Sequence, residues 1–124
     1  MLESEIEEIL VDTVRGLGGR AYKWVSPGNA GVPDRMVILP GCKPIFVELK
    51  TDTGQLTRLQ RIQIDRLRRL GQDVRVVKGL SGVAEFFGDI GYPDVEKKIM
   101  KKRGSGKDGV HTARISETLP AEDH

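Results

Sequence analysis

The stretch that most constrains the fold of this chain spans residues 31–50, GVPDRMVILPGCKPIFVELK. Its two apolar runs, MVIL and PIFVEL, flank a Pro-Gly-Cys-Lys turn, which predicts two β-strands joined as a hairpin. In a hairpin the start of the first strand lies beside the end of the second, so we expect Asp34 near Glu48 and Lys50. Side chains alternate between the two faces of a strand, so Glu48 and Lys50 point the same way. The hairpin therefore predicts two carboxylates and one ammonium at one end of a sheet.

A charge cluster of this kind needs a chemical explanation, because burying unpaired charge costs several kcal/mol or more. Asp34 and Glu48 offer hard oxygen donors that suit Mg²⁺ or Mn²⁺, which keep several waters. Lys50 stands where it could lower the pKa of a metal-bound water or hold that water for attack on a phosphodiester. The sequence has no His or Cys set with zinc spacing, no P-loop, no dinucleotide fingerprint and no nucleophilic serine elbow. These residues therefore point to metal-dependent phosphodiester hydrolysis.

The composition limits the remaining possibilities. At 124 residues, with 38% hydrophobic and 31% charged residues, the chain fits one soluble globular domain. Its net charge of +2 means that affinity for nucleic acid must come from local patches. A single cysteine, Cys42, cannot form an internal disulfide, and no apolar run is long enough to span a membrane. We therefore expect a protein of the reducing cytoplasm with no membrane partner.

Apolar periodicity along the rest of the chain predicts the order α-β-β-β-α-β-α, with three meandering strands and a helix that leads to the fourth. This order predicts an α/β fold with a mixed four-stranded sheet flanked by helices. Ser4 could cap the first helix, although a start one turn earlier fits the pattern equally well. The predicted helices span residues 2–17, 55–70 and 83–87, and the predicted strands span residues 21–25, 36–39, 44–49 and 74–78.

Two predictions concern the side chains that fill the core. Tyr22 and Trp24 share one face of the first strand, and we expect core packing rather than a stacking platform for bases. The apolar arc of the second long helix also contains Gln60 and Gln63, and polar amides that face a core need hydrogen-bond partners. We expect the burial of that arc to come from Leu56, Leu59, Leu67 and Leu70.

The Pro-Asp at residues 33–34 and the Glu-x-Lys at residues 48–50 resemble the signature of the PD-(D/E)xK nucleases. The fuller pattern GVPDR, FVELK and LTRLQ is similar to the VRR-NUC family, whose stand-alone members come from bacteriophages and bacteria. The resemblance covers about residues 4–87, most of the chain. It implies a restriction-endonuclease-like core, in agreement with the order of elements predicted from the periodicity.

The resemblance also implies roles for individual residues. Asp34 and Glu48 would bind Mg²⁺ (or Mn²⁺), with the backbone carbonyl of Leu49 as a further metal ligand. Lys50 would be the catalytic lysine of the Glu-x-Lys motif. Gln60 occupies the glutamine position of the LTRLQ pattern, which implies a place in or next to the active site.

The family pattern further includes an acid from the first helix. The Ile-Glu pair at residues 6–7 matches that pattern best, so the resemblance implies that Glu7 positions a water or holds a second metal ion. Glu3 is the alternative, because both acids lie at one edge of the apolar arc of the helix. Four acids in the first turns would equally complement the helix dipole, and this structural interpretation stays open.

Two segments are candidates for contact with DNA. Residues 26–33 form a loop directly before Asp34, where Ser26, Asn29 or backbone amides could contact a phosphate, although an ordinary connection between strands explains the loop as well. The outward face of the second long helix is rich in arginine, which suits either phosphate contact or a solvated surface. We assign DNA binding to Arg58 and Arg61 among the five arginines Arg58, Arg61, Arg66, Arg68 and Arg69.

The predicted function is a Mg²⁺-dependent endonuclease that acts on DNA. The resemblance implies a preference for branched DNA, as in a Holliday-junction resolvase, and a homodimer, because a symmetric pair puts two sites on opposing strands. The alternatives are a flap or nicking nuclease, a restriction-type nuclease, or a DNA-binding module on a nuclease fold without catalysis. The resemblance also implies a bacterial or phage-infected cell.

We expect the nuclease domain to span residues 1–90 and a C-terminal extension to span residues 91–124. The sequence DVEKKIMKKR at residues 94–103 predicts a short basic helix, and the polar residues after it predict a tail. Disorder, docking on a partner subunit and contact with DNA are the alternatives for this tail. His111 and His124 are far from other plausible ligands, so we assign neither to a metal.

Overall fold

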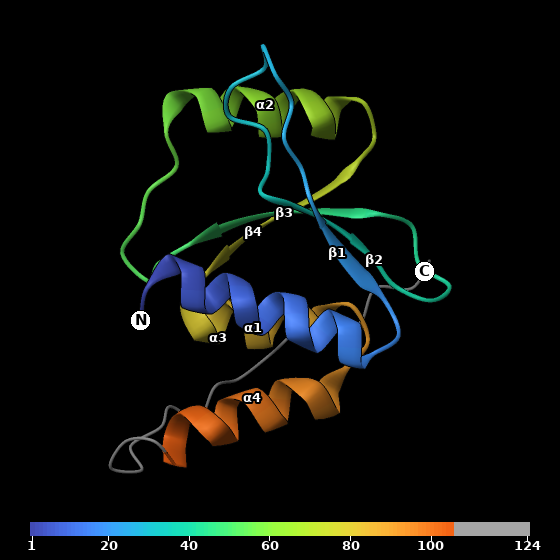
Figure 1. Cartoon of the computed structure of the whole chain (residues 1–124), viewed down its shortest axis with the longest axis vertical. Coiled ribbons are helices and arrows are strands. Elements are labelled where there is room, and N and C mark those ends of the chain that lie inside the picture. The colour runs from blue at the N-terminus through green and yellow to red at the C-terminus, as the bar shows by residue number, and fades with distance from the viewer. Residues whose placement is uncertain (106–124) are drawn as a thin grey trace.

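One mixed sheet forms the centre of the structure, with strand order β1-β2-β3-β4 (Figure 1). The computed structural model describes residues 1–105. β1, β2 and β3 are antiparallel neighbours, whereas β4 pairs with β3 in parallel. The predicted α/β fold class, a restriction-endonuclease-like core around a mixed four-stranded sheet, is confirmed. The elements in chain order are α1 (Glu3–Gly16), β1 (Arg20–Lys23), β2 (Arg35–Ile38), β3 (Ile45–Lys50), α2 (Arg58–Arg69), β4 (Asp73–Lys78), α3 (Gly79–Asp89) and α4 (Pro93–Ser105).

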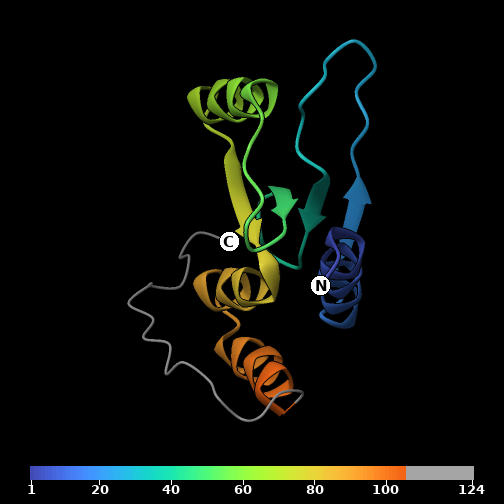
Figure 2. The ribbon, with the colours of Figure 1, turned by 90° about the vertical axis from the view of Figure 1, so that its left-hand side faces the viewer.

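The core lies between one face of the sheet and the helices α1 and α3. Figures 1 and 2 show α1, α3 and α4 on one side of the sheet and α2 on the other. β3 follows the alternation expected of a strand, since Ile45, Val47 and Leu49 all face the core and are almost fully buried. The partners of β3 in this core are Ile6, Leu10 and Val14 of α1, Val77 of β4, and Val83, Phe86 and Phe87 of α3.

The C-terminal extension begins with a helix that joins this core. α4 packs against α3, and its Ile99 is buried, with Val95 and Met100 partly buried beside it. The basic helix predicted at residues 94–103 therefore forms, with slightly wider bounds, and its packing is continuous with the preceding domain. Residues 106–124, which include the predicted tail, His111 and His124, lie outside the described residues. Within the described part, no helix is both long and apolar enough to cross a membrane.

The structure corrects the prediction for the apolar arc of α2. Ile64 is the buried residue of this helix, whereas Leu59 and Leu70 are 51% and 68% exposed. The reason is that α2 stands apart from the sheet, beside the loop between β1 and β2 (Figures 1 and 2). Gln63 Nε2 donates to the backbone oxygen of Ala30 in that loop at 3.4 Å, the hydrogen-bond partner that a polar residue on this face requires.

Two further predictions at the N-terminal end need correction. The residue that caps α1 is Leu2, and its N–H donates to the Glu5 carboxylate at 2.6 Å, so Ser4 is not the cap. The carboxylate of Glu5 can reach back because it lies three residues into the helix. Tyr22 is 57% exposed on the edge strand β1, so it is not a core residue. Trp24, by contrast, packs against Phe46 with ring centroids 5.0 Å apart.

Candidate active site

The hairpin of β2 and β3 brings Asp34 and Glu48 together. Arg35 pairs with Val47, so continuing this antiparallel register by one residue sets Asp34 opposite Glu48. Asp34 Oδ2 accepts a hydrogen bond from the backbone N–H of Leu49 at 2.8 Å, which fixes its carboxylate against β3. The juxtaposition predicted from the turn and from strand alternation is therefore present in the structure.

Glu48 is the one buried charged residue among those that the structure describes, at 1% exposure. Its Oε2 accepts a hydrogen bond from Gln60 Nε2 at 2.9 Å and lies 3.7 Å from Lys50 Nζ. Its Oε1 is buried and has no hydrogen-bond partner. Burial raises the pKa of Glu48 from 4.5 to about 8, and the negative charge of Asp34 adds to this effect, while Lys50 opposes it. An acid with one unpartnered oxygen in such a place is costly for folding and is suited to a ligand.

Gln60 links α2 to this acid through a capping box. Thr57 Oγ1 accepts from the backbone N–H of Gln60 at 3.2 Å, and Gln60 Oε1 accepts from the backbone N–H of Thr57 at 2.9 Å. The side-chain oxygen of Gln60 therefore caps the helix while its side-chain nitrogen donates to Glu48. The Thr-x-x-Gln spacing at residues 57–60 is the sequence signal for this arrangement, although no cap was predicted there.

The two candidate acids of the first helix, Glu7 and Glu3, have different surroundings. Glu7 Oε2 accepts a hydrogen bond from Arg35 Nε at 2.7 Å, and Arg35 Nη1 also donates to the backbone oxygen of Ala21 at 2.9 Å. Glu7 thus has a partner outside the carboxylate pair. Among the acids of α1, Glu3 is the one whose charge raises the pKa of Glu48. Glu3, the alternative for the first-helix acid, therefore lies near enough to Glu48 for its charge to act there.

The residues proposed to contact DNA lie in the loop before Asp34 and near the start of α2. In the loop before Asp34, Asn29 Nδ2 donates to Ser26 Oγ at 3.0 Å, so these two side chains stabilise their own turn. Arg58 and Arg61 are exposed near the start of α2, and Arg61 Nη2 donates to the backbone oxygen of Leu56 at 3.3 Å. Both arginines are therefore accessible to a ligand, whereas the side chains of Ser26 and Asn29 bond to each other.

Other arginines of α2 have structural partners. Arg68 donates through Nη2 and Nε to the backbone oxygen of Val74, at 2.7 and 3.3 Å, and so ties α2 to β4. Arg69 pairs with Asp65 at 2.8 Å on the exposed face of the helix. The arginine-rich face is therefore partly structural, since a guanidinium that is held by the protein is less available to a phosphate.

The donor set fits a hard divalent cation. No three His, Cys, Asp or Glu side chains within residues 1–105 converge into a metal site of their own. Asp34 and Glu48 instead form a pair of carboxylates, one of which has a buried oxygen without a partner. Mg²⁺ is typically held by one or two carboxylates and keeps several waters, so two protein carboxylates are sufficient.

A mixed sheet that carries this Asp, Glu-x-Lys arrangement at the end of its central hairpin defines a PD-(D/E)xK nuclease. The model of the VRR-NUC domain matches residues 3–80, more than half of the chain. The chain therefore belongs to the VRR-NUC family, and it is a nuclease by family.

Individual relatives agree with this assignment. "Putative nuclease p44" of Acyrthosiphon pisum secondary endosymbiont phage 1 is 51% identical over 75 residues, which cover 60% of this chain and 81% of that protein. A solved structure described as "VRR_NUC domain" is 29% identical, with a TM-score of 0.66, and the match covers 69% of this chain and 94% of that one. A second, "VRR_NUC domain protein", shares the fold at 19% identity and a TM-score of 0.61, over 77% of this chain and 90% of that one.

Proposed function

We propose that this nuclease is a Mg²⁺- (or Mn²⁺-) dependent DNA endonuclease that holds its metal with Asp34 and Glu48. The observation that carries the proposal is the buried Glu48 carboxylate, which has one oxygen without a partner and lies beside a second carboxylate. Without a cation this arrangement raises the pKa of Glu48, and a bound divalent cation would favour the ionised form instead. The backbone carbonyl of Leu49, the residue between Glu48 and Lys50 on β3, is the third proposed metal ligand.

When bound, such a cation makes water more acidic and stabilises the negative charge that develops on a phosphodiester during cleavage. The protein supplies the positions of the other groups. The Leu49 N–H holds the Asp34 carboxylate, and Gln60 holds the Glu48 carboxylate, so both acids are oriented before substrate arrives. Only one oxygen of each acid is used for this, so each keeps an oxygen for the cation.

Lys50 is the proposed catalytic lysine. Its side chain is 12% exposed and its ammonium lies 3.7 Å from Glu48, on the face that the two acids share. An ammonium there can donate a hydrogen bond to the attacking water or to a phosphate oxygen, and it offsets charge that develops in the transition state. Glu3, or Glu7 if Arg35 releases it, would position that water from α1.

The proposed substrate is branched DNA, cut in the manner of a Holliday-junction resolvase by a homodimer. The family supports DNA as the substrate class, and two copies related by a twofold axis would present two sites to opposing strands. The exposed Leu59 and Leu70 of α2 offer apolar surface that a second copy could remove from water. Arg58 and Arg61, with Ser26 and Asn29 in the loop before Asp34, are the proposed phosphate contacts. The phage origin of the similar nuclease fits action in the cytoplasm of a bacterial or phage-infected cell.

The test is cleavage of an end-labelled four-way junction, a flap and a linear duplex by the wild-type protein and by Glu48→Gln, with Mg²⁺ or EDTA. We expect paired symmetrical nicks on the junction that disappear with EDTA and in the variant. Cutting of flaps alone, or nicking of duplex alone, would support the nuclease activity and refute the junction as the preferred substrate. Tight binding without any cleavage in Mg²⁺ or Mn²⁺ would refute the proposed activity in favour of a DNA-binding module.

A further inference from the structure

Lys78 lies next to the proposed catalytic lysine, although they are far apart in the sequence. β3 and β4 run parallel in a register that pairs Glu48 with Val76 and Lys50 with Lys78. Paired residues of neighbouring strands point to the same face and lie about 4.8 Å apart. Lys78 is therefore on the face that carries Glu48 and Lys50, one strand farther from Asp34.

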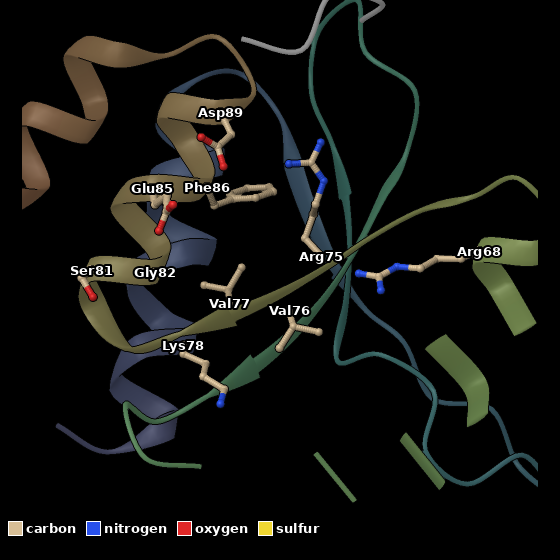
Figure 3. Close-up of a pocket in the computed structure, with 10 residues that line it drawn as sticks. All are labelled: Arg68, Arg75, Val76, Val77, Lys78, Ser81, Gly82, Glu85, Phe86 and Asp89. Carbon is tan, nitrogen blue, oxygen red and sulfur yellow. The ribbon is translucent and has the colours of Figure 1, made fainter. Parts of the chain in front are cut away.

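Figure 3 shows Lys78 among the residues that line a groove beside β4. β4 is an edge strand, and a groove of about 540 Å³ runs along it, lined by residues of α2, β4 and α3. Val77 points toward α3, whereas Val76 and Lys78 point away from it. The acids of α3 that line the groove, Glu85 and Asp89, lie on the other side of the strand from Lys78.

Lys78 differs from the neighbouring cations in having no partner among the described residues. Arg75 is held by Asp73, at 2.6 and 3.2 Å, and Arg68 is held by the backbone oxygen of Val74. Lys50 pairs with Glu48. Lys78 is half-buried and makes no hydrogen bond or ion pair with any residue of the described chain. An ammonium that is partly removed from water and makes no hydrogen bond or ion pair is well suited to bind an anion that a ligand supplies.

The start of a helix adds positive potential close to Lys78. Lys78 is the residue that immediately precedes α3, where the backbone N–H groups already create positive potential. The Asp52 carboxylate approaches Gly79 closely, and a Cβ at Gly79 would collide with it, yet Asp52 forms no ion pair with Lys78. Asp52 offsets part of the positive potential at this helix end, whereas Lys50, paired with Lys78 on the neighbouring strand, adds to it on the active-site face, where an anion would bind.

We propose that Lys78 binds a backbone phosphate of the DNA strand that is cut, adjacent to the phosphate that Lys50 faces. This inference rests on the proposed function for the substrate class and goes beyond it by adding a binding residue from β4. An ammonium one strand away from Lys50 can reach the next phosphate along the DNA backbone, because the two lysines are separated by about 4.8 Å at the backbone. Lys78 thereby sets the position of the strand relative to Asp34 and Glu48.

The first experiment measures DNA binding in Glu48→Gln protein with EDTA, so that cleavage plays no part. Removing one phosphate contact reduces the slope of log Kd against log salt by about 1 and weakens binding about tenfold at low salt. We expect this result for Lys78→Ala, with partial rescue by Lys78→Arg. Lys98→Ala, at an exposed lysine on α4, is the matched control and should leave the slope unchanged. A wild-type slope in Lys78→Ala would overturn the proposal.

The second experiment identifies the phosphate. A single neutral methylphosphonate is moved along the cut strand of the preferred substrate, and Kd is measured for the protein that retains Lys78 and for the Lys78→Ala variant. We expect one position at which the neutral linkage raises the Kd of the protein that retains Lys78 but leaves the Kd of the Lys78→Ala variant unchanged. The absence of any such position would overturn the proposal even if the slope changes.

The two proposals fail in different ways. A wild-type protein that binds DNA but never cleaves it refutes the nuclease activity, and the binding series still tests Lys78. A protein that cleaves normally while Lys78→Ala shows wild-type binding and KM refutes the role of Lys78 alone. Absence of DNA binding altogether refutes both. Equal thermal stability of the lysine variants verifies that each comparison concerns folded protein.

Discussion

Glu48→Gln should stabilise the protein in the absence of metal, even though it removes a proposed metal ligand. Glu48 is 1% exposed, and burial with Asp34 beside it raises its pKa from 4.5 to about 8. Glutamine has nearly the same shape and no charge. Its oxygen can accept the hydrogen bond from Gln60, and its amide can donate to Asp34 as a protonated Glu48 would. The variant therefore keeps the packing and removes the titration.

The sign and size of this stabilisation follow from proton linkage. Between pH 4.5 and 8 the folded protein keeps a proton on Glu48 that the unfolded chain has already lost, so stability falls as pH rises through this window. Each pH unit in this window lowers the free energy of unfolding by at most about 1.4 kcal/mol. At pH 7 the destabilisation is about 3 kcal/mol, which corresponds to a shift in Tm on the order of 10 °C for a chain of this size. Glu48→Gln should regain most of that difference at pH 7 and almost none at pH 4.5.

The assay is thermal unfolding in EDTA from pH 5 to pH 8, for wild type, Glu48→Gln and the control Glu8→Gln. Glu8 is exposed on α1, so its variant should follow the wild-type curve. Mg²⁺ should raise the Tm of the wild type, and more strongly at pH 8 than at pH 6, because at pH 8 a smaller fraction of Glu48 carries a proton that the cation must displace. The Tm of Glu48→Gln should scarcely change. Parallel pH profiles for wild type and Glu48→Gln in EDTA would refute the reasoning, because they would mean that Glu48 is ionised without a cation.

Three other substitutions test the site and its support. Lys50→Ala should lose cleavage yet still bind Mn²⁺ in a calorimetric titration, and normal cleavage would remove Lys50 from the proposed chemistry. Gly31→Ala should cost more stability than Gly28→Ala. Both glycines have positive φ, which strains alanine by about 1–2 kcal/mol. Of the two, only Gly31 would bring its new Cβ against another chain segment, 2.6 Å from the backbone of Leu59. Equal losses of Tm in the two alanine variants would contradict this close packing. Gln60→Glu keeps the acceptor for the Thr57 N–H but puts a second acid against Glu48, so metal binding should require higher pH than in the control Gln63→Glu. An unchanged pH midpoint would show that the contact from Gln60 does not tune Glu48.

The sequence was sufficient for the centre of the site because local rules determine it. A short turn between two apolar runs leaves one pairing in which both strands bury the same face, and that pairing sets Asp34 opposite Glu48. The parallel position of β4 follows from the helix that precedes it, since a helical connection carries the chain back to the same edge. Neither inference requires knowledge of distant contacts.

The first-helix acid and the apolar arc of α2 could not be obtained in this way. Helical periodicity put Glu3 and Glu7 at the same edge of α1, and the difference between them comes from Arg35, a partner on β2 that periodicity does not reveal. In α2, periodicity alone did not identify the buried side, because burial depends on what covers the helix: Leu59 is left exposed, and Ile64, which the predicted arc did not include, is buried. The capping box of Thr57 and Gln60 was missed because the helix was predicted to begin at residue 55 instead of Arg58.

These contacts divide the site into a rigid part and a less constrained part. Asp34, Glu48 and Lys50 come from the sheet, whose strands β2 and β3 pair directly and bury the core on the opposite face. Gln60 comes from α2, which buries a single residue and is attached through Arg68, Gln63 and the close approach of Gly31. Local opening costs least where few apolar contacts must break, so α2 is the element that DNA could displace while the strands that carry the acids stay paired. Because Gln60 donates to the oxygen of Glu48 that also faces Lys50, a shift of α2 would change the proton affinity of Glu48 directly, and this contact would couple the proposed DNA binding at the arginine face to the proposed metal binding at the sheet.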